Sequence, residues 1–188
     1  MPEPLPVVRG AAQGGRHPAP CIGEFLAGRR RAVLLDNNVL ASDWGLAQIE
    51  KIVRRGIRVD FNQGLDARRI ARCPEVAELL ARVRWLRFLR MAYDTSALRD
   101  DVRRAVELLG RCGIPPRKLF FYVLVRDDID DALRRIRELK TLGCMPFAQP
   151  YRDFAGGTKP SREQWRLAYW CNNRRLFKAM DFTDYKCK

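Results

Sequence analysis

The stretch Lys118-Leu-Phe-Phe-Tyr-Val-Leu-Val125 decides the fold, together with the helical pattern that follows it. A nearly unbroken apolar run of this length is typical of a strand that is buried on both faces of a parallel sheet. Four aspartates then crowd a predicted helix start, where negative charge complements the helix dipole. An apolar stripe from Ile129 to Leu139 follows, and Gly143 ends the pattern. The two segments together predict one βα unit.

Four more apolar runs predict strands, at 31–36, 57–61, 85–89 and 145–149. Successive runs start about 25 to 35 residues apart, which is the spacing of a βα repeat. Right-handed crossovers then make the strands parallel. The predicted helices between them begin near Ser42, Pro74 and Thr95 or Ser96. About five such units predict an α/β fold, either a partial (β/α) barrel or an open doubly wound sheet.

Composition divides the 188 residues into three parts. Residues 1–28 are rich in Pro and Gly and predict a disordered leader. Residues 29–155 hold the βα units, and residues 156–188 predict a helical extension with one helix from about Arg162 to Met180. The only histidine, His17, lies in the leader, which does not favour His-based acid–base catalysis.

The net charge of +14 first suggests nucleic acid as a partner. However, Arg supplies 29 of the 36 basic residues, and these residues are spread over every predicted helix without an aromatic-interleaved cluster. We therefore favour a solvated Arg-rich surface over a nucleic-acid groove. The sequence shows no secretory signal, no membrane-spanning run and no closely spaced cysteines, and predicts a cytoplasmic protein with reduced thiols.

Each predicted strand ends in polar residues, and parallel α/β folds bind ligands at these carboxyl ends. Asp36, Asn37 and Asn38 follow the first strand, where they can bind a ligand or form a turn and helix cap. Asn62 and Gln63 follow the second strand, next to Gly64, which permits close approach of a ligand.

Three more candidates have structural alternatives. Asp66 can face the ligand or pair with Arg68. Asp94 can accept from a ribose hydroxyl or cap the next helix. Gln149 and Tyr151 end the last strand, where Tyr151 can stack on a base or pack in the core or in a lid.

Taken in order, these blocks resemble the radical S-adenosylmethionine (radical SAM) superfamily, in particular short members from bacteria and phages. The resemblance covers about residues 30 to 185 and rests on five stretches, which are 33–42, 59–68, 88–94, 116–125 and 146–151. It implies a partial (β/α) barrel, S-adenosylmethionine (SAM) as cofactor and a [4Fe–4S] cluster that cleaves SAM to a 5′-deoxyadenosyl radical.

The resemblance also implies roles for individual residues. Asp36, Asn37 and Asn38 would lie near the SAM methionine group, and Asn62, Gln63 and Asp66 would face SAM or the substrate. Asp94 would lie near the ribose. Residues 122–125 and 149–151 would lie on the adenine side.

The sequence departs from the family in front of its first predicted strand. It has no CxxxCxxC motif to hold the cluster and no preceding strand, so the chain resembles a truncated or degenerate member. We expect weak or absent redox chemistry and an exposed sheet edge at 32–36. The alternative function is a basic α/β binding module for nucleic acid or an acidic partner, without catalysis.

Overall fold

The computed structural model describes residues 7–9, 22–26, 28–36 and 38–186, which form an α/β fold with parallel strands. Four strands form one sheet in the order β1 (Val7–Arg9), β2 (Arg31–Leu35), β3 (Arg58–Phe61) and β4 (Arg84–Trp85). Three strands form the other, in the order β5 (Leu89–Ala92), β6 (Leu119–Val125) and β7 (Met145–Pro150). Every strand pair is parallel, as the sequence predicts.

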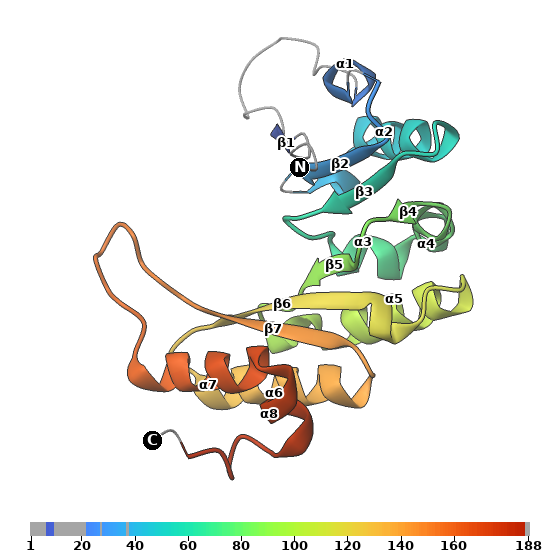
Figure 1. The fold of residues 1–188 in the computed structure, drawn as a ribbon. Helices are drawn as coiled ribbons and strands as arrows, with labels where there is room; N and C mark the ends of the chain where they lie inside the picture. The colour runs from blue at the N-terminus through green and yellow to red at the C-terminus, as the bar shows by residue number, and fades with distance from the viewer. Residues whose placement is uncertain (1–6, 10–21, 27, 37, 187–188) are drawn as a thin grey trace.

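Helices connect the strands. The α-helices are α1 (Ile22–Leu26), α2 (Asp43–Arg54), α3 (Ala67–Arg72), α4 (Pro74–Ala81), α5 (Arg99–Arg111), α6 (Ile129–Thr141), α7 (Arg162–Asn172) and α8 (Arg174–Ala179). Short 3-10 helices are η1 (Val39–Ala41), η2 (Ser96–Leu98) and η3 (Pro116–Lys118). Figure 1 shows α2 to α5 along one side of the strands and α6 and α7 beneath β6 and β7.

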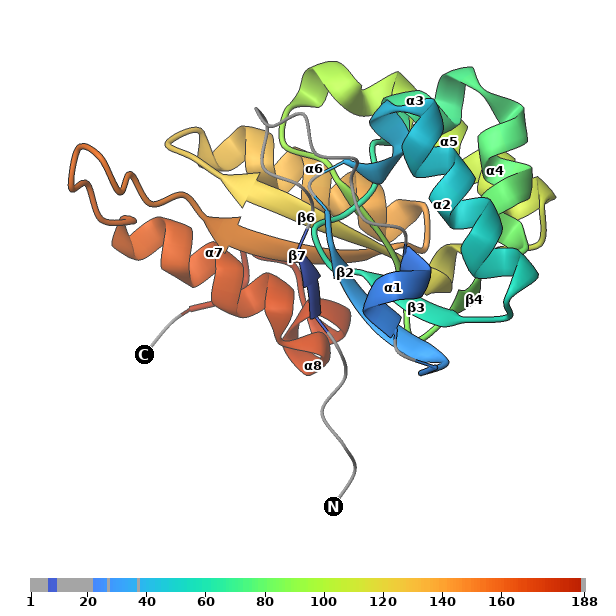
Figure 2. The same ribbon diagram turned by 90° about the horizontal axis from the view of Figure 1, so that it is seen from above.

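The two sheets meet just beyond the carboxyl end of β3. Leu65 forms a parallel bridge with Met91 of β5, and its backbone N–H donates to the Arg90 carbonyl at 2.7 Å. The strands β1, β2, β3, β5, β6 and β7 therefore follow one another in space in the order of the chain. Seen from above, the layer of strands turns between β2–β3 and β6–β7, with the helices on its outside (Figure 2).

The predicted helix boundaries are confirmed where a cap or a glycine specifies them. The Ser42 side chain accepts from the Gly45 N–H at the start of α2, and Pro74 opens α4. Asp128 caps α6 by accepting from the Asp131 N–H at 2.8 Å. Gly56 follows α2 with a φ of +64°, a conformation that glycine adopts without strain.

Two expectations about residues 1–36 differ from the structure. The expectation that no strand precedes Arg31 is wrong, because Val7–Arg9 pairs with Val33–Leu35. That pairing also covers the edge of β2 that we expected to be exposed. Within residues 1–28, the structure describes this strand, α1 and Gly28, while Cys21 and His17 lie outside the described residues.

Three further predictions need correction. The third strand is Leu89–Ala92 instead of 85–89, because the chain bends at 86–88 and only Arg84–Trp85 pairs with β3. The last helix is interrupted at Asn173, whose extended backbone lets its side chain cap α8. Finally, β6 is not fully buried on both faces, since Phe120, Tyr122 and Leu124 are half-buried.

The alternation along β6 divides the sheet into two faces. The fully buried residues Leu119, Phe121, Val123 and Val125 belong to the main hydrophobic core with the apolar stripes of the helices. The half-buried face carries the rings of Phe120 and Tyr122 on β6 and of Phe147 on β7, together with the charged side chain of Arg90 on β5. This second face and the strand ends beside it hold the candidate site.

Candidate functional site

The carboxyl ends of the parallel strands lie on one side of the molecule and bring most of the predicted polar residues together. The Asn62 N–H, just after β3, donates to the Leu34 carbonyl of β2 at 3.0 Å. The Tyr122 hydroxyl of β6 donates to the Asn62 carbonyl at 2.8 Å. Asn62 is therefore held between β2 and β6, although the two strands belong to different sheets.

Asp94 is fixed to the tip of the neighbouring strand. One of its carboxylate oxygens accepts from the Leu124 N–H at 3.1 Å, and the side chain is exposed. Thr95, the next residue, caps η2. The predicted capping role thus falls to Thr95, and Asp94 offers a solvent-facing carboxylate at the ends of β5 and β6.

Tyr151 lies at the end of the same row of strands. Its N–H donates to the Val125 carbonyl at 2.8 Å, and the Arg126 guanidinium lies 5.1 Å from the centre of its ring. The ring is 42% exposed, so the alternative that it packs into the core does not hold. Gln149, on β7, is also exposed.

The Asp36–Asn38 stretch forms the turn that the sequence allows, but the Asn38 side chain does not cap the following helix η1. Asp36 accepts from the Asn38 N–H at 2.9 Å, which makes a local turn before η1. The side-chain oxygen of Asn38 is buried, and it has no hydrogen-bond donor in the described part of the chain. A buried acceptor without a donor costs about 1–3 kcal/mol, so this amide is ready to receive a ligand donor. Asn37 lies outside the described residues.

Asp66 matches its structural alternative. It caps α3 by accepting from the Arg68 N–H at 2.9 Å, and its two oxygens also accept from the Arg68 side chain. Burial raises the pKa of Asp66, but the hydrogen bonds and charge of Arg68 outweigh burial, and the pKa is lowered. Gln63 is exposed, and the structure records no hydrogen bond of its side chain among the described residues.

Gly64 has a backbone conformation that other residues rarely adopt. Its φ is +91°, and a Cβ at this position would lie 3.5 Å from the Met91 backbone and 3.6 Å from the Tyr122 ring. The glycine therefore lets the chain after β3 run close to β5 and β6. This approach positions Asn62 and Leu65 for the contacts described above.

We call the carboxyl ends of the strands, with Asp36, Asn38, Asn62, Asp94 and Tyr151, the rim. A buried ion pair beneath the rim is the feature that the sequence analysis missed. The Arg90 guanidinium makes two hydrogen bonds to Asp60, at 2.7 and 2.8 Å, with both side chains less than 15% exposed. Arg90 also donates to the Tyr122 hydroxyl at 3.3 Å. The available signal was a charged residue at an inner position of each strand, Asp60 in β3 and Arg90 in β5.

A second buried arginine holds the strand ends from the helix side. Arg135 of α6 donates to the backbone carbonyls of Tyr93 at 2.5 Å and Leu124 at 3.1 Å, and to Asp131 at 2.7 Å. Only 3% of Arg135 is exposed. The backbone of Tyr93, directly before Asp94, and the backbone of Leu124, which donates to Asp94, are fixed in this way. The helical pattern gives no sign that Arg135 is buried.

The cysteines of the described residues do not fit an iron–sulfur cluster. Such a cluster needs converging thiolates, but no group of three or more His, Cys, Asp or Glu residues could hold a metal ion in the described ranges. Burial also raises the pKa of the Cys144 and Cys171 thiols to about 12, which keeps both protonated at neutral pH. We therefore derive no chemical step through a cluster.

Comparisons with known proteins give no further guidance, because no family model, curated protein or solved structure matches the chain. In the part of the chain that the structure describes, no helix is long and apolar enough to cross a membrane.

Proposed function

We propose that this chain is a radical SAM-like protein with a partial (β/α) barrel, which binds SAM at the carboxyl ends of its strands. The barrel is supported by parallel strands that follow one another in chain order, with the Leu65–Met91 bridge between the two sheets. When bound to a cluster, SAM supplies a 5′-deoxyadenosyl radical. Because the described cysteines do not form a cluster site, our proposal for these residues is limited to binding.

The observation that carries the proposal is the row of groups along the rim that can still take up a ligand. Asp94 presents an exposed carboxylate that can accept from the ribose hydroxyls. The buried oxygen of Asn38 can accept from the methionine ammonium group. Tyr151 offers an exposed ring on which the adenine can stack.

Charge supports the same ligand. SAM carries a sulfonium cation, and aspartates follow the strands at this end of a chain whose net charge is +14. The carboxylates of Asp36 and Asp94 lie at or next to the tips of β2 and β5. A cationic ligand is attracted to this rim more than to the Arg-rich remainder of the surface.

Isothermal titration calorimetry with SAM tests the proposal. We expect saturable binding to the intact chain, and a loss of affinity of about tenfold or more in Asp94→Asn, because a hydrogen bond to a charged group contributes about 1.5–3 kcal/mol. The amide oxygen of the variant can still accept from the Leu124 N–H, so the fold should be kept.

The matched control is Asp184→Asn, which removes an exposed carboxylate near the C-terminus. This variant should bind SAM like the parent chain. Equal loss in both variants, or no binding of SAM to the folded protein even after anaerobic reconstitution with iron and sulfide, would contradict the proposal.

A further inference from the structure

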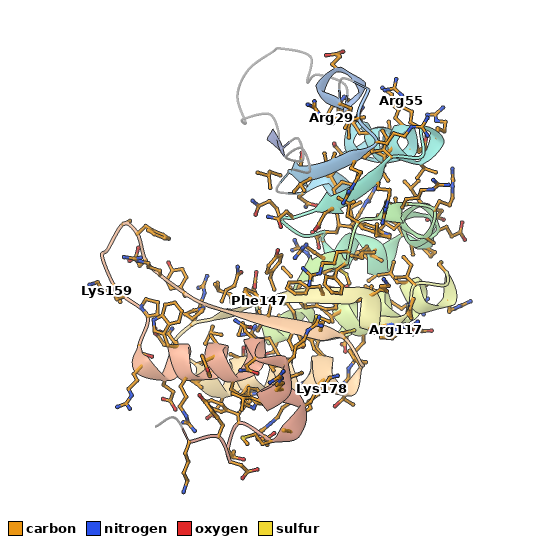
Figure 3. The ribbon with its side chains drawn as sticks, viewed as in Figure 1. Arg29, Arg55, Arg117, Phe147, Lys159 and Lys178 are labelled. Atoms are coloured by element: carbon orange, nitrogen blue, oxygen red, sulfur yellow. The ribbon has the colours of Figure 1, made fainter. Side chains whose placement is uncertain are left out.

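A pocket of about 570 Å³ lies beside the amino-terminal halves of β6 and β7, away from the rim. It is bounded by the segment before β5, by η3, by the start of β7 and by the α7–α8 junction. The lining includes Arg117, Phe147 and Lys178, which Figure 3 labels. The edge of β7 is closed at this place, because the Asn172 side chain exchanges hydrogen bonds of 2.8 and 2.9 Å with the Ala148 backbone.

The lining of the pocket is strongly cationic. It includes six basic side chains and no acidic one; the basic residues are Arg87, Arg90, Arg117, Lys140, Arg174 and Lys178. Only Arg90 is paired with a carboxylate, that of Asp60, among the described residues. Lys140 donates to the Phe177 carbonyl at 2.7 Å, and Arg174 contacts the Met145 sulfur at 2.8 Å. The pocket therefore keeps most of its positive charge for a ligand.

Helix dipoles do not account for this concentration of charge. Basic residues are common in the last turn of a helix, where they complement the dipole. Of the six side chains, only Lys140 and Lys178 occupy the last turn of an α-helix. Arg87 and Arg90 come from the segment around β5, and Arg117 from η3. The cations that line the pocket therefore come from separate segments, and no single feature of local structure explains why they lie together.

A row of aromatic rings crosses the same pocket. Phe88 stacks on Phe120 and Phe120 stacks on Phe147, each pair with ring centres 5.7 Å apart. Phe147 ends the row because β7 is the last strand of its sheet. Phe177 lies on the helix side of the pocket, with the Lys140 ammonium 4.8 Å from its ring centre. An aromatic ligand can continue the row as its next member.

We propose that this pocket binds a nucleotide unit, either free or within a single-stranded nucleic acid. Its phosphate lies against Arg117 and Lys178, which make no ion pair among the described residues, and its base stacks beside Phe147. Cationic grooves that carry stacking rings are the usual means of binding single strands without sequence preference. The site is at the opposite end of the strands from the rim and does not rest on SAM binding.

Fluorescence anisotropy with a labelled 12-nucleotide oligothymidylate tests the proposal on the intact chain. The parent protein should bind the strand with an affinity that falls steeply with salt. The charge-reversal double variant Arg117→Glu/Lys178→Glu should lose affinity about tenfold or more and show a shallower salt dependence. Phe147→Ala should weaken binding about tenfold through loss of stacking, without changing the salt dependence.

The matched control reverses two cations far from the pocket, in the double variant Arg55→Glu/Lys159→Glu. Figure 3 shows Arg55 beside α2 and Lys159 on the loop that follows β7, on the opposite side from Arg117. This variant has the same net charge as the test variant and should lose less than about threefold. Equal loss in the two double variants, or no binding by the parent protein at low salt, would overturn the proposal.

Two further probes identify the form of the ligand. If AMP displaces the oligonucleotide at millimolar concentration, the pocket binds a free nucleotide, and if AMP does not, it requires a strand. Both results support a nucleotide site. An abasic oligonucleotide that binds as tightly as oligothymidylate would contradict the stacking role of Phe147 and overturn the assignment to a nucleotide.

Discussion

The two ends of the parallel strands differ in charge and in how that charge is used. At the carboxyl ends, aspartates follow β2, β5 and β6, and some of them serve the fold, as Asp128 does by capping α6. At the amino ends, six cations line one pocket without an acid among them. Helix dipoles favour the first arrangement in any βα repeat, whereas in the second they account for only Lys140 and Lys178 of the six cations. A charged side chain that has no role in the fold is therefore a better indication of a ligand site than one that caps a helix.

The Asp60–Arg90 pair connects the two ends and carries the largest expected effect. Arg90 lines the basic pocket and also supports Tyr122, whose hydroxyl holds Asn62 at the rim. Arg90→Ala leaves Asp60 buried without its partner, which should lower the free energy of unfolding by about 3–5 kcal/mol. Urea denaturation measures this loss.

The control for this variant is Arg54→Ala. Arg54 pairs with Glu50 at 3.5 Å, and both side chains are more than half exposed. An exposed pair of this kind contributes about 0–1 kcal/mol. Similar losses in the two variants would show that the pair beneath the rim is not buried as described.

The stability of the carboxyl-end side should depend on pH through Tyr93, which contacts Glu138 of α6. Burial, and then the hydrogen bond of 2.8 Å to Glu138, raise the pKa of Tyr93 to about 12. The folded state therefore favours the protonated phenol. Its contribution is fully present below the ordinary tyrosine pKa of about 10 and is lost as the pH rises toward 12, with a total on the order of 2 kcal/mol.

Unfolding measured between pH 9 and 12 tests this assignment, with Tyr93→Phe as the control, since this variant lacks the titrating hydroxyl. The variant should show a smaller loss of stability with rising pH than the parent.

Glu138 contributes to the pH dependence of stability in the acid range. Burial raises its pKa, but hydrogen bonds from Tyr93 and Arg103 outweigh burial and lower the pKa, so its contribution is present above the ordinary Glu pKa and lost as the pH falls below it.

Much of the fold follows from the sequence, and the exceptions have physical causes. The strands β2, β3, β6 and β7 and the caps at Ser42 and Asp128 follow from local patterns. β5 was misplaced because Arg90 interrupts its apolar pattern, and the Asp60 that neutralises this charge is 30 residues away. The break at Asn173 was missed because Trp170 and Phe177 continue the apolar pattern across it and pack on each other.

The sequence identifies fewer of the residues in the candidate sites than it does elements of the fold. Strand ends are visible in a sequence, so Asp36, Asn62, Asp94 and Tyr151 could be named from their positions. The basic pocket was not, because its side chains come from separate segments and each looks like an ordinary surface arginine or lysine. Only the three-dimensional arrangement shows that Arg117 and Lys178 border the same cavity.

Gly64 provides a smaller test of how the rim is built. With φ at +91°, Gly64→Ala should lower the free energy of unfolding by about 1–2 kcal/mol. Gly110→Ala is the control, because this residue lies within α5 and a Cβ there meets no atom within 4 Å. That change should instead stabilise the chain by about 0.5–1 kcal/mol. Chemical denaturation measures both changes in the free energy of unfolding. Changes of the same sign in the two variants would contradict the role given to Gly64.

Asp66 gives the smallest expected effect and separates cap residues from ligand residues at the carboxyl ends. Asp66→Ala should lower stability by about 1 kcal/mol through loss of the α3 cap. Because Arg68 already occupies its carboxylate, SAM affinity should change less than about twofold. A tenfold loss of SAM affinity in this variant, measured by calorimetry, would show that Asp66 contacts the ligand.

Hydrogen–deuterium exchange with each ligand is the most direct test of the two-ended arrangement. We predict that SAM slows exchange at 36–40, 62–66 and 93–96, whereas oligothymidylate slows exchange at 87–90, 144–147 and 172–178. Two separate footprints would support binding sites at opposite ends of the strands. A single shared footprint, or protection at the rim by oligothymidylate alone, would contradict the account.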